Sequence, residues 1–149
     1  PSPRKREFEL TEATEEAQTG VYNVKEMNFS VTGTNIKTLL FNDELYPMKG
    51  WFELVVVTSK ILYNIDKEKF DEIVKQNKIH KATFTRAYYL GKDPIISKEE
   101  KYLASPYYVE EIGYYIECSL SADRAKYYTT QLINEYGLID QFRMEIEEK

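Results

Sequence analysis

The sequence predicts an α+β fold, a single domain in which a mainly antiparallel sheet is packed by about three helices. Apolar residues alternate along residues 112–120 and 142–146, which is typical of strands with one buried face. Between residues 51 and 65 they recur at steps of three and four, which is typical of an amphipathic helix. At 149 residues, 42% of them hydrophobic, the chain suits one domain with one core.

The N-terminal part differs in composition from the rest. Residues 1–6 combine two prolines with three consecutive cations and no apolar residue, so we expect a disordered linker or tail. Residues 7–34 are expected to form an N-terminal extension with one or two strands. Within it Met27, Phe29 and Val31 alternate with polar residues and would share one strand face. Residues 35–149 are expected to form the α+β module.

The first half of the module predicts a hairpin and two helices. Residues 36–41 are β-prone, and the dipeptide Asn42-Asp43 before Leu45 has the spacing of a tight hairpin. A helix over residues 50–65 follows. Its predicted inward face consists of Trp51, Leu54, Val55, Thr58, Leu62 and Ile65. Asp66 is expected to cap a second helix over residues 66–78, with Phe70, Ile73 and Val74 inward.

The second half predicts strands around one more helix. Residues 81–90 favour a strand and residues 93–109 a loop. In the strand over residues 112–120 the predicted inward residues are Ile112, Tyr114, Ile116, Cys118 and Leu120. Ser121 is a good N-cap and Gly137 a natural stop for a helix over residues 122–136. Its predicted apolar face is Ala125, Tyr128, Leu132 and Tyr136, and Phe142, Met144 and Ile146 alternate into a last strand.

Composition and residue inventory argue against several classes of function. No segment approaches the roughly 20 apolar residues of a membrane span, and the default expectation is a cytoplasmic protein. One cysteine, Cys118, excludes an internal disulfide, and its predicted place in the core favours an inert thiol. His80 is the single histidine, and we find no metal, cofactor or phosphate-loop signature. Glu110, Glu111 and Glu117 are more simply interpreted as a solvated strand edge than as acid–base groups. We therefore predict that the chain is not an enzyme.

Charge and tyrosine distribution favour binding instead. The net charge is −5, yet the segment from Lys75 to Lys92 contains five Lys or Arg and no acid. Nine of the 13 tyrosines lie between Tyr88 and Tyr128, most of them in adjacent pairs. Because neighbours on a strand point to opposite faces, we expect one ring of a strand pair to be inward, as at Tyr88 and Tyr114, and the phase of the predicted helix places Tyr128 inward. The candidate binding residues are Lys75, Lys78, Lys81, Arg86, Tyr89, Lys92, Tyr115 and Tyr127.

Two interpretations of these residues remain open. In the first, the cations contact phosphates and the tyrosines stack on the bases of a nucleic acid. In the second, exposed tyrosines bind a partner protein, or the acidic chain is an inhibitor from a mobile element that competes with nucleic acid for a basic protein. A membrane partner is not expected.

Two segments have the pattern of a known module. Residues 113–122 read Gly-Tyr-Tyr-Ile-Glu-Cys-Ser-Leu-Ser-Ala before a predicted helix, and residues 41–51 lead from a predicted hairpin into a Trp-led helix. These segments resemble a small α+β accessory module found near the C-termini of bacterial restriction-modification and defence-associated proteins. The resemblance covers about residues 35–147, with Cys118-Ser119 in place of Thr-Asn and Asn42-Asp43 in place of a glycine. It carries no catalytic assignment and implies an accessory recognition role in a larger system.

Overall fold

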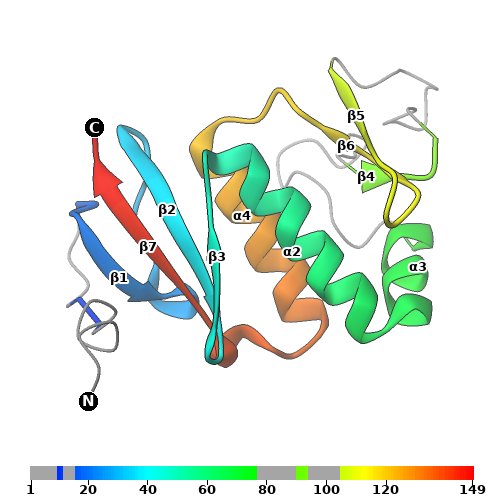
Figure 1. Ribbon diagram of the computed structural model, residues 1–149, viewed down its shortest axis with the longest axis horizontal. Coiled ribbons are helices and arrows are strands. Elements are labelled where there is room, and N and C mark those ends of the chain that lie inside the picture. The colour runs from blue at the N-terminus through cyan, green and yellow to red at the C-terminus, as the bar shows by residue number, and fades with distance from the viewer. Residues whose placement is uncertain (1–9, 12–15, 77–89, 94–104) are drawn as a thin grey trace.

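The protein has an α+β fold with two antiparallel sheets (Figure 1). The structure, a computed structural model, describes residues 10–11, 16–76, 90–93 and 105–149. In Figure 1 the larger sheet lies at one end, helices α2 and α4 lie in the middle, and the smaller sheet lies with α3 at the other end. The two central helices therefore separate the sheets and pack against each other. The predicted fold class is confirmed.

The larger sheet has the strand order β1-β7-β2-β3, with every neighbouring pair antiparallel. Its strands are β1 (Gly20–Asn23), β2 (Thr34–Phe41), β3 (Glu44–Pro47) and β7 (Phe142–Glu148). The predicted hairpin is confirmed, because Asn42 has a φ of 53° in the two-residue turn between β2 and β3. The predicted last strand is β7, in which Phe142, Met144 and Ile146 are fully buried in the core.

Residues 27–31 do not form the predicted strand. The chain instead passes from β1 through the 3-10 helix η1 (Val24–Glu26) into an irregular segment. The expected alternation of burial is nevertheless present, since Met27, Phe29 and Val31 are buried and the residues between them are exposed. The reason is that side chains of α4, rather than a neighbouring strand, satisfy backbone polar groups of this segment.

The described residues form three α-helices, α2 (Trp51–Ile65), α3 (Lys67–Lys75) and α4 (Ala122–Glu135). The predicted N-caps are confirmed, since Asp66 accepts a hydrogen bond from Lys69 N at 3.0 Å and Ser121 from Arg124 N at 3.2 Å. Gly137 has a φ of 69° after α4, as a helix stop requires.

The predicted inward faces of the helices are confirmed with one exception. Ile65, in the last turn of α2, is 49% exposed. The core at this end is filled instead by Tyr63 and Phe70, whose ring centroids lie 5.5 Å apart.

The smaller sheet has the order β4-β6-β5, with β4 (Leu90–Gly91), β5 (Pro106–Val109) and β6 (Tyr114–Glu117). Two predictions are corrected here. Residues 106–109 form a strand and not a loop, and the strand predicted over residues 112–120 is shorter because Ile112 and Gly113 belong to the turn that precedes it. Most of the strand predicted over residues 81–90 lies outside the described residues.

The predicted inward position of Cys118 is also wrong. Cys118 is exposed, and the preceding Glu117 is buried. The alternation fails because β6 ends at Glu117, whose Oε1 accepts hydrogen bonds from Ser105 N at 2.9 Å and Ser119 N at 3.1 Å. A carboxylate with these donors stabilises the strand end, and the next side chain turns to solvent. No helix in the described part of the chain is long and apolar enough to cross a membrane.

Candidate binding surface

Two tyrosines of the smaller sheet form a candidate binding surface. We call Tyr108 and Tyr115 the tyrosine surface. Tyr108 of β5 lies directly opposite Tyr115 of β6, with ring centroids 4.9 Å apart and an interplanar angle of 49°. Residues directly opposite one another share a face of the sheet, so these rings form one aromatic pair. On the other side of Tyr115 the cross-strand neighbour is Gly91, which adds no side chain beside the ring.

The rings of β5 are open to solvent. Tyr107 and Tyr108 are each 49% exposed, whereas Tyr115 is partly buried between its neighbours. Tyr107 points to the opposite face of the strand and meets Phe52 of α2 edge-on, with ring centroids 5.4 Å apart. A half-exposed ring that lies beside a second ring on the same sheet face, as Tyr108 lies beside Tyr115, is typical of a surface that binds a partner.

A buried tyrosine anchors this sheet to α3. Tyr114 is 1% exposed, and its hydroxyl donates a hydrogen bond to Asp71 Oδ1. Its ring meets that of Phe70 at 5.0 Å, so β6 and α3 share both an apolar and a polar contact. Burial raises the pKa of Tyr114 well above its usual range, and the hydrogen bond to Asp71 raises it further. The hydroxyl therefore remains a donor and keeps the strand beneath the tyrosine surface in place.

Charges of both signs lie on the elements next to the tyrosine surface. Lys92 follows β4, with Nζ 3.9 Å from Asp71 Oδ1 and 5.8 Å from the centroid of the Tyr114 ring. On the turn between β5 and β6, Glu110 and Glu111 are exposed. Lys60 Nζ of α2 lies 2.5 Å from Glu111 Oε2, and this hydrogen bond from Lys60 holds the pKa of Glu111 below its ordinary value.

The structure brings some of the predicted binding residues together. Tyr115 lies on β6 beside Gly91, and Lys92 follows directly. Lys92 contacts Asp71 on α3, and Lys75 lies exposed one turn further along that helix. Lys75, Lys92 and Tyr115 therefore belong to the end of the molecule that holds α3 and the smaller sheet (Figure 1).

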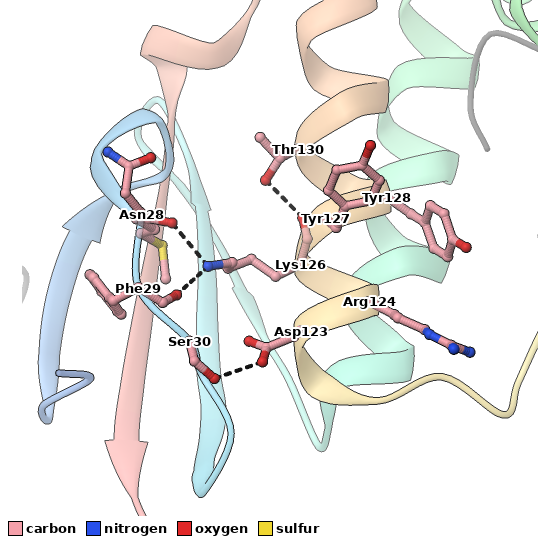
Figure 2. A pocket seen from close by; sticks show the side chains of 10 residues that line it. Asn28, Phe29, Ser30, Asp123, Arg124, Lys126, Tyr127, Tyr128 and Thr130 are labelled. Atoms are coloured by element: carbon pink, nitrogen blue, oxygen red, sulfur yellow. Dashed lines mark hydrogen bonds between the residues drawn. The ribbon is translucent and has the colours of Figure 1, made fainter. Parts of the chain in front are cut away.

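Tyr127 does not join them. It lies partly buried on α4, where it lines a separate pocket with Tyr128 (Figure 2). The predicted inward positions of Tyr114 and Tyr128 are confirmed, as both are buried. The predicted residues Lys78, Lys81, Arg86, Tyr88 and Tyr89 lie outside the described residues.

Tyr107 and Tyr108 are not among the predicted binding residues, because residues 93–109 are predicted to form a loop. A signal for them is present. Residues 107–109 read Tyr-Tyr-Val, which favours a strand, and Gly113 allows a turn into the strand that follows. Gly113 has a φ of 72° and its N–H donates to Val109 O at 2.8 Å.

The described residues hold no group of three or more metal-ligating side chains. Comparisons with protein-family models, with curated proteins and with solved structures gave no match for this chain. The functional proposal therefore rests on the tyrosine surface. Its chemistry is that of stacking and hydrogen bonding by two tyrosine side chains.

Proposed function

We propose that the chain is a noncatalytic recognition module that binds single-stranded nucleic acid through the tyrosine surface. The observation that carries this proposal is the cross-strand pair of Tyr108 and Tyr115 on one face of the smaller sheet, in which the Tyr108 ring is half-exposed. The resemblance of residues 113–122 to the accessory module suggests a bacterial or phage defence-related system as the setting.

Stacking supplies the binding energy in this proposal. Base–aromatic stacking contributes about 1–3 kcal/mol per base and tolerates any sequence, because every base has a π-face. Tyr108 is 49% exposed and its ring lies beside that of Tyr115, whose cross-strand neighbour on β4 is Gly91, so the Tyr108 ring is accessible for stacking. Lys92 and Lys75 are exposed and suited to contact phosphates.

Titration of labelled oligothymidylate and oligouridylate of about 15 nucleotides, followed by fluorescence anisotropy, tests the proposal. At roughly 50 mM salt we expect binding that weakens at roughly 200 mM, because phosphate contacts release counterions. Tyr108→Ala should weaken binding by roughly 5- to 50-fold. Tyr46→Ala is the matched control, since Tyr46 is a partly buried tyrosine on β3 of the other sheet. The absence of binding at the lower salt concentration would refute the proposal.

A partner protein is the second candidate ligand, and a specific observation favours it. Glu110 and Glu111 stand exposed on the turn beside the tyrosine surface, and the net charge of the chain is −5. Carboxylates at this place repel phosphates and suit a basic protein surface, whereas tyrosine is common in protein interfaces. Purification of the protein from its native host distinguishes the two candidate ligands. Nucleic acid absorbance in the peak supports the first, and a stoichiometric protein lost with Tyr108→Ala supports the second.

A further inference from the structure

Strand β3 is an edge of the larger sheet, whose order is β1-β7-β2-β3. At the opposite edge the chain covers itself, because Val21 N donates to Thr11 Oγ1 at 2.8 Å and Thr11 N donates to Val21 O at 2.5 Å. In the described part of the chain no strand pairs with the outer side of β3. An edge of this kind presents backbone donors and acceptors to which a further strand can bind.

The register of the β2–β3 hairpin shows which backbone groups of β3 point outward. Met48 N donates to Lys37 O at 2.8 Å, in the same register as the pairing of β3 with β2. Along an antiparallel strand, residues that bond to one neighbour alternate with residues that point away from it. Leu45 and Pro47 therefore direct their backbone groups outward. Leu45 offers an N–H and a carbonyl, and Pro47 offers a carbonyl alone, so an added strand gains up to three hydrogen bonds.

A groove of about 480 Å³ lies between this hairpin and α2. In Figure 1 α2 begins beside the end of β3 and runs away from it at an angle. The helix wall of the groove is apolar, because Val57, Ile61 and Ile65 recur at four-residue steps and all line it. Ile65 is the residue of the predicted inward face that is 49% exposed, and its place in this wall accounts for its exposure. We call this site the β3 groove.

The charged groups of the β3 groove favour a cationic ligand. Glu44 is exposed and lines the groove, and its Oε2 accepts a hydrogen bond from the Tyr46 hydroxyl at 2.6 Å. This bond raises the pKa of Tyr46 to about 12, so the hydroxyl stays a donor and holds the carboxylate in place. Lys60 also lines the groove, but its ammonium is paired with Glu111 Oε2 at 2.5 Å. Among the described lining residues, the carboxylate of Glu44 is therefore the charge that is open to a ligand.

A basic peptide suits this edge better than a second copy of the chain does. Two β3 strands paired about a twofold axis at Leu45 would place both Glu44 carboxylates on the same face of the joined sheet, where like charges repel. Each chain also carries a net charge of −5. A cationic segment of a partner removes both repulsions.

We propose that the β3 groove binds an extended basic peptide segment of a partner protein, which adds to β3 as an antiparallel strand. The peptide residue opposite Leu45 exchanges two backbone hydrogen bonds with it. The residue that follows lies opposite Glu44 and is an arginine or lysine, and the residue that precedes is apolar and points into the groove, as the strand alternation requires. In this mode main-chain bonds give affinity and alternate side chains give specificity. The site is independent of the tyrosine surface, which lies on the other sheet.

The test uses the peptide acetyl-Thr-Ile-Thr-Val-Thr-Arg-Thr-amide, with isothermal calorimetry for affinity and amide NMR shifts for location. We expect a dissociation constant of about 1 mM or tighter, with shifts in residues 44–47 and 57–65. A peptide that is N-methylated at its third threonine keeps every side chain and loses the N–H that meets Leu45 O, so it should bind roughly tenfold more weakly. A peptide with glutamate in place of arginine should also bind roughly tenfold more weakly.

Two substitutions of exposed side chains locate the contacts in the protein. Glu44→Gln should weaken binding of the arginine peptide by roughly fivefold and leave a glutamine analogue of the peptide unaffected, whereas Glu26→Gln, an exposed carboxylate on η1, should change neither. Ile65→Ser should weaken both peptides by roughly threefold to tenfold. Leu10→Ser is its matched control, because Leu10 is 51% exposed at the β1 edge.

Four results would overturn the inference. The wild-type protein does not bind the peptide, the N-methylated peptide binds equally well, or Glu44→Gln binds the arginine peptide as wild type does. The fourth is a shift of the β3 amides with protein concentration in the absence of peptide, which would show that a second copy occupies the edge.

Discussion

The hydroxyl of Tyr114 connects the smaller sheet to α3, and Tyr114→Phe measures how much this connection contributes to stability. The substitution keeps the ring, so it creates no cavity larger than the missing oxygen. A hydrogen bond to a charged group contributes about 1.5–3 kcal/mol. The side chain of Asp71 is 45% exposed and keeps Lys92 at 3.9 Å, so water and the ammonium partly replace the lost donor. We therefore expect a loss of about 1.5 kcal/mol in the free energy of unfolding.

Urea denaturation followed by the fluorescence of Trp51, the single tryptophan, provides the assay. With an m-value of about 1–3 kcal/mol/M, the midpoint should fall by roughly 0.5–1.5 M. Tyr108→Phe is the control, because the Tyr108 ring is half-exposed, and its free energy of unfolding should stay within about 0.5 kcal/mol of that of wild type. Asp71→Asn combined with Tyr114→Phe should be less destabilising than the sum of the single changes. An unchanged midpoint in Tyr114→Phe, or additive losses in the double variant, would show that the bond does not couple β6 to α3.

Three further predictions concern α4 and the segment it holds. Asp123→Asn should lower the stability at neutral pH by roughly 1–2 kcal/mol, because a charged acceptor is lost to three donors, Ser30 Oγ, Val31 N and Thr32 Oγ1. The pKa of Asp123 is lower in the folded than in the unfolded protein, so wild-type stability should fall as the pH drops from about 5 to about 2. The variant should show a shallower fall in an acid titration of the urea midpoint, and equal slopes would contradict the assignment. Ser121→Ala removes the N-cap of α4 and should cost about 1 kcal/mol in thermal unfolding, whereas Ser119→Ala, outside the helix, should cost less. Gly137→Ala should also cost about 1 kcal/mol, because its φ of 69° strains a Cβ, and an unchanged Tm would contradict this.

Elements with local chemical signals could be predicted from the sequence. Asp66 and Ser121 each cap a helix through a hydrogen bond to a backbone N–H three residues later, so the signal and its effect are neighbours in the chain. The turn at Asn42 and the stop at Gly137 depend only on the conformational preference of one or two residues. The buried face of β7 follows from strict alternation over its whole length.

Elements that depend on distant partners could not be predicted in this way. Residues 27–31 alternate like a strand, but their backbone carbonyls bond to Lys126, which lies 97 and 99 residues further along the chain. No local pattern indicates that a lysine side chain takes the place of a neighbouring strand. The exposure of Cys118 has a similar cause, since Ser105 N bonds to Glu117 across 12 residues and ends the alternation of β6.

The tyrosine surface depends both on a local pattern and on a long-range contact. Adjacent tyrosines attract attention in the sequence, yet neighbours on a strand point to opposite faces, so an adjacent pair does not make one aromatic surface. The rings that do meet, Tyr108 and Tyr115, come from two such pairs on two strands, and their other members, Tyr107 and Tyr114, face the opposite way. Which ring joins which depends on the register of β5 against β6, and that register depends on the turn at Gly113. A shift of one residue would place Tyr108 opposite a different residue and remove the pair. Variants of the β5–β6 turn should therefore affect binding at this surface as strongly as removal of a ring.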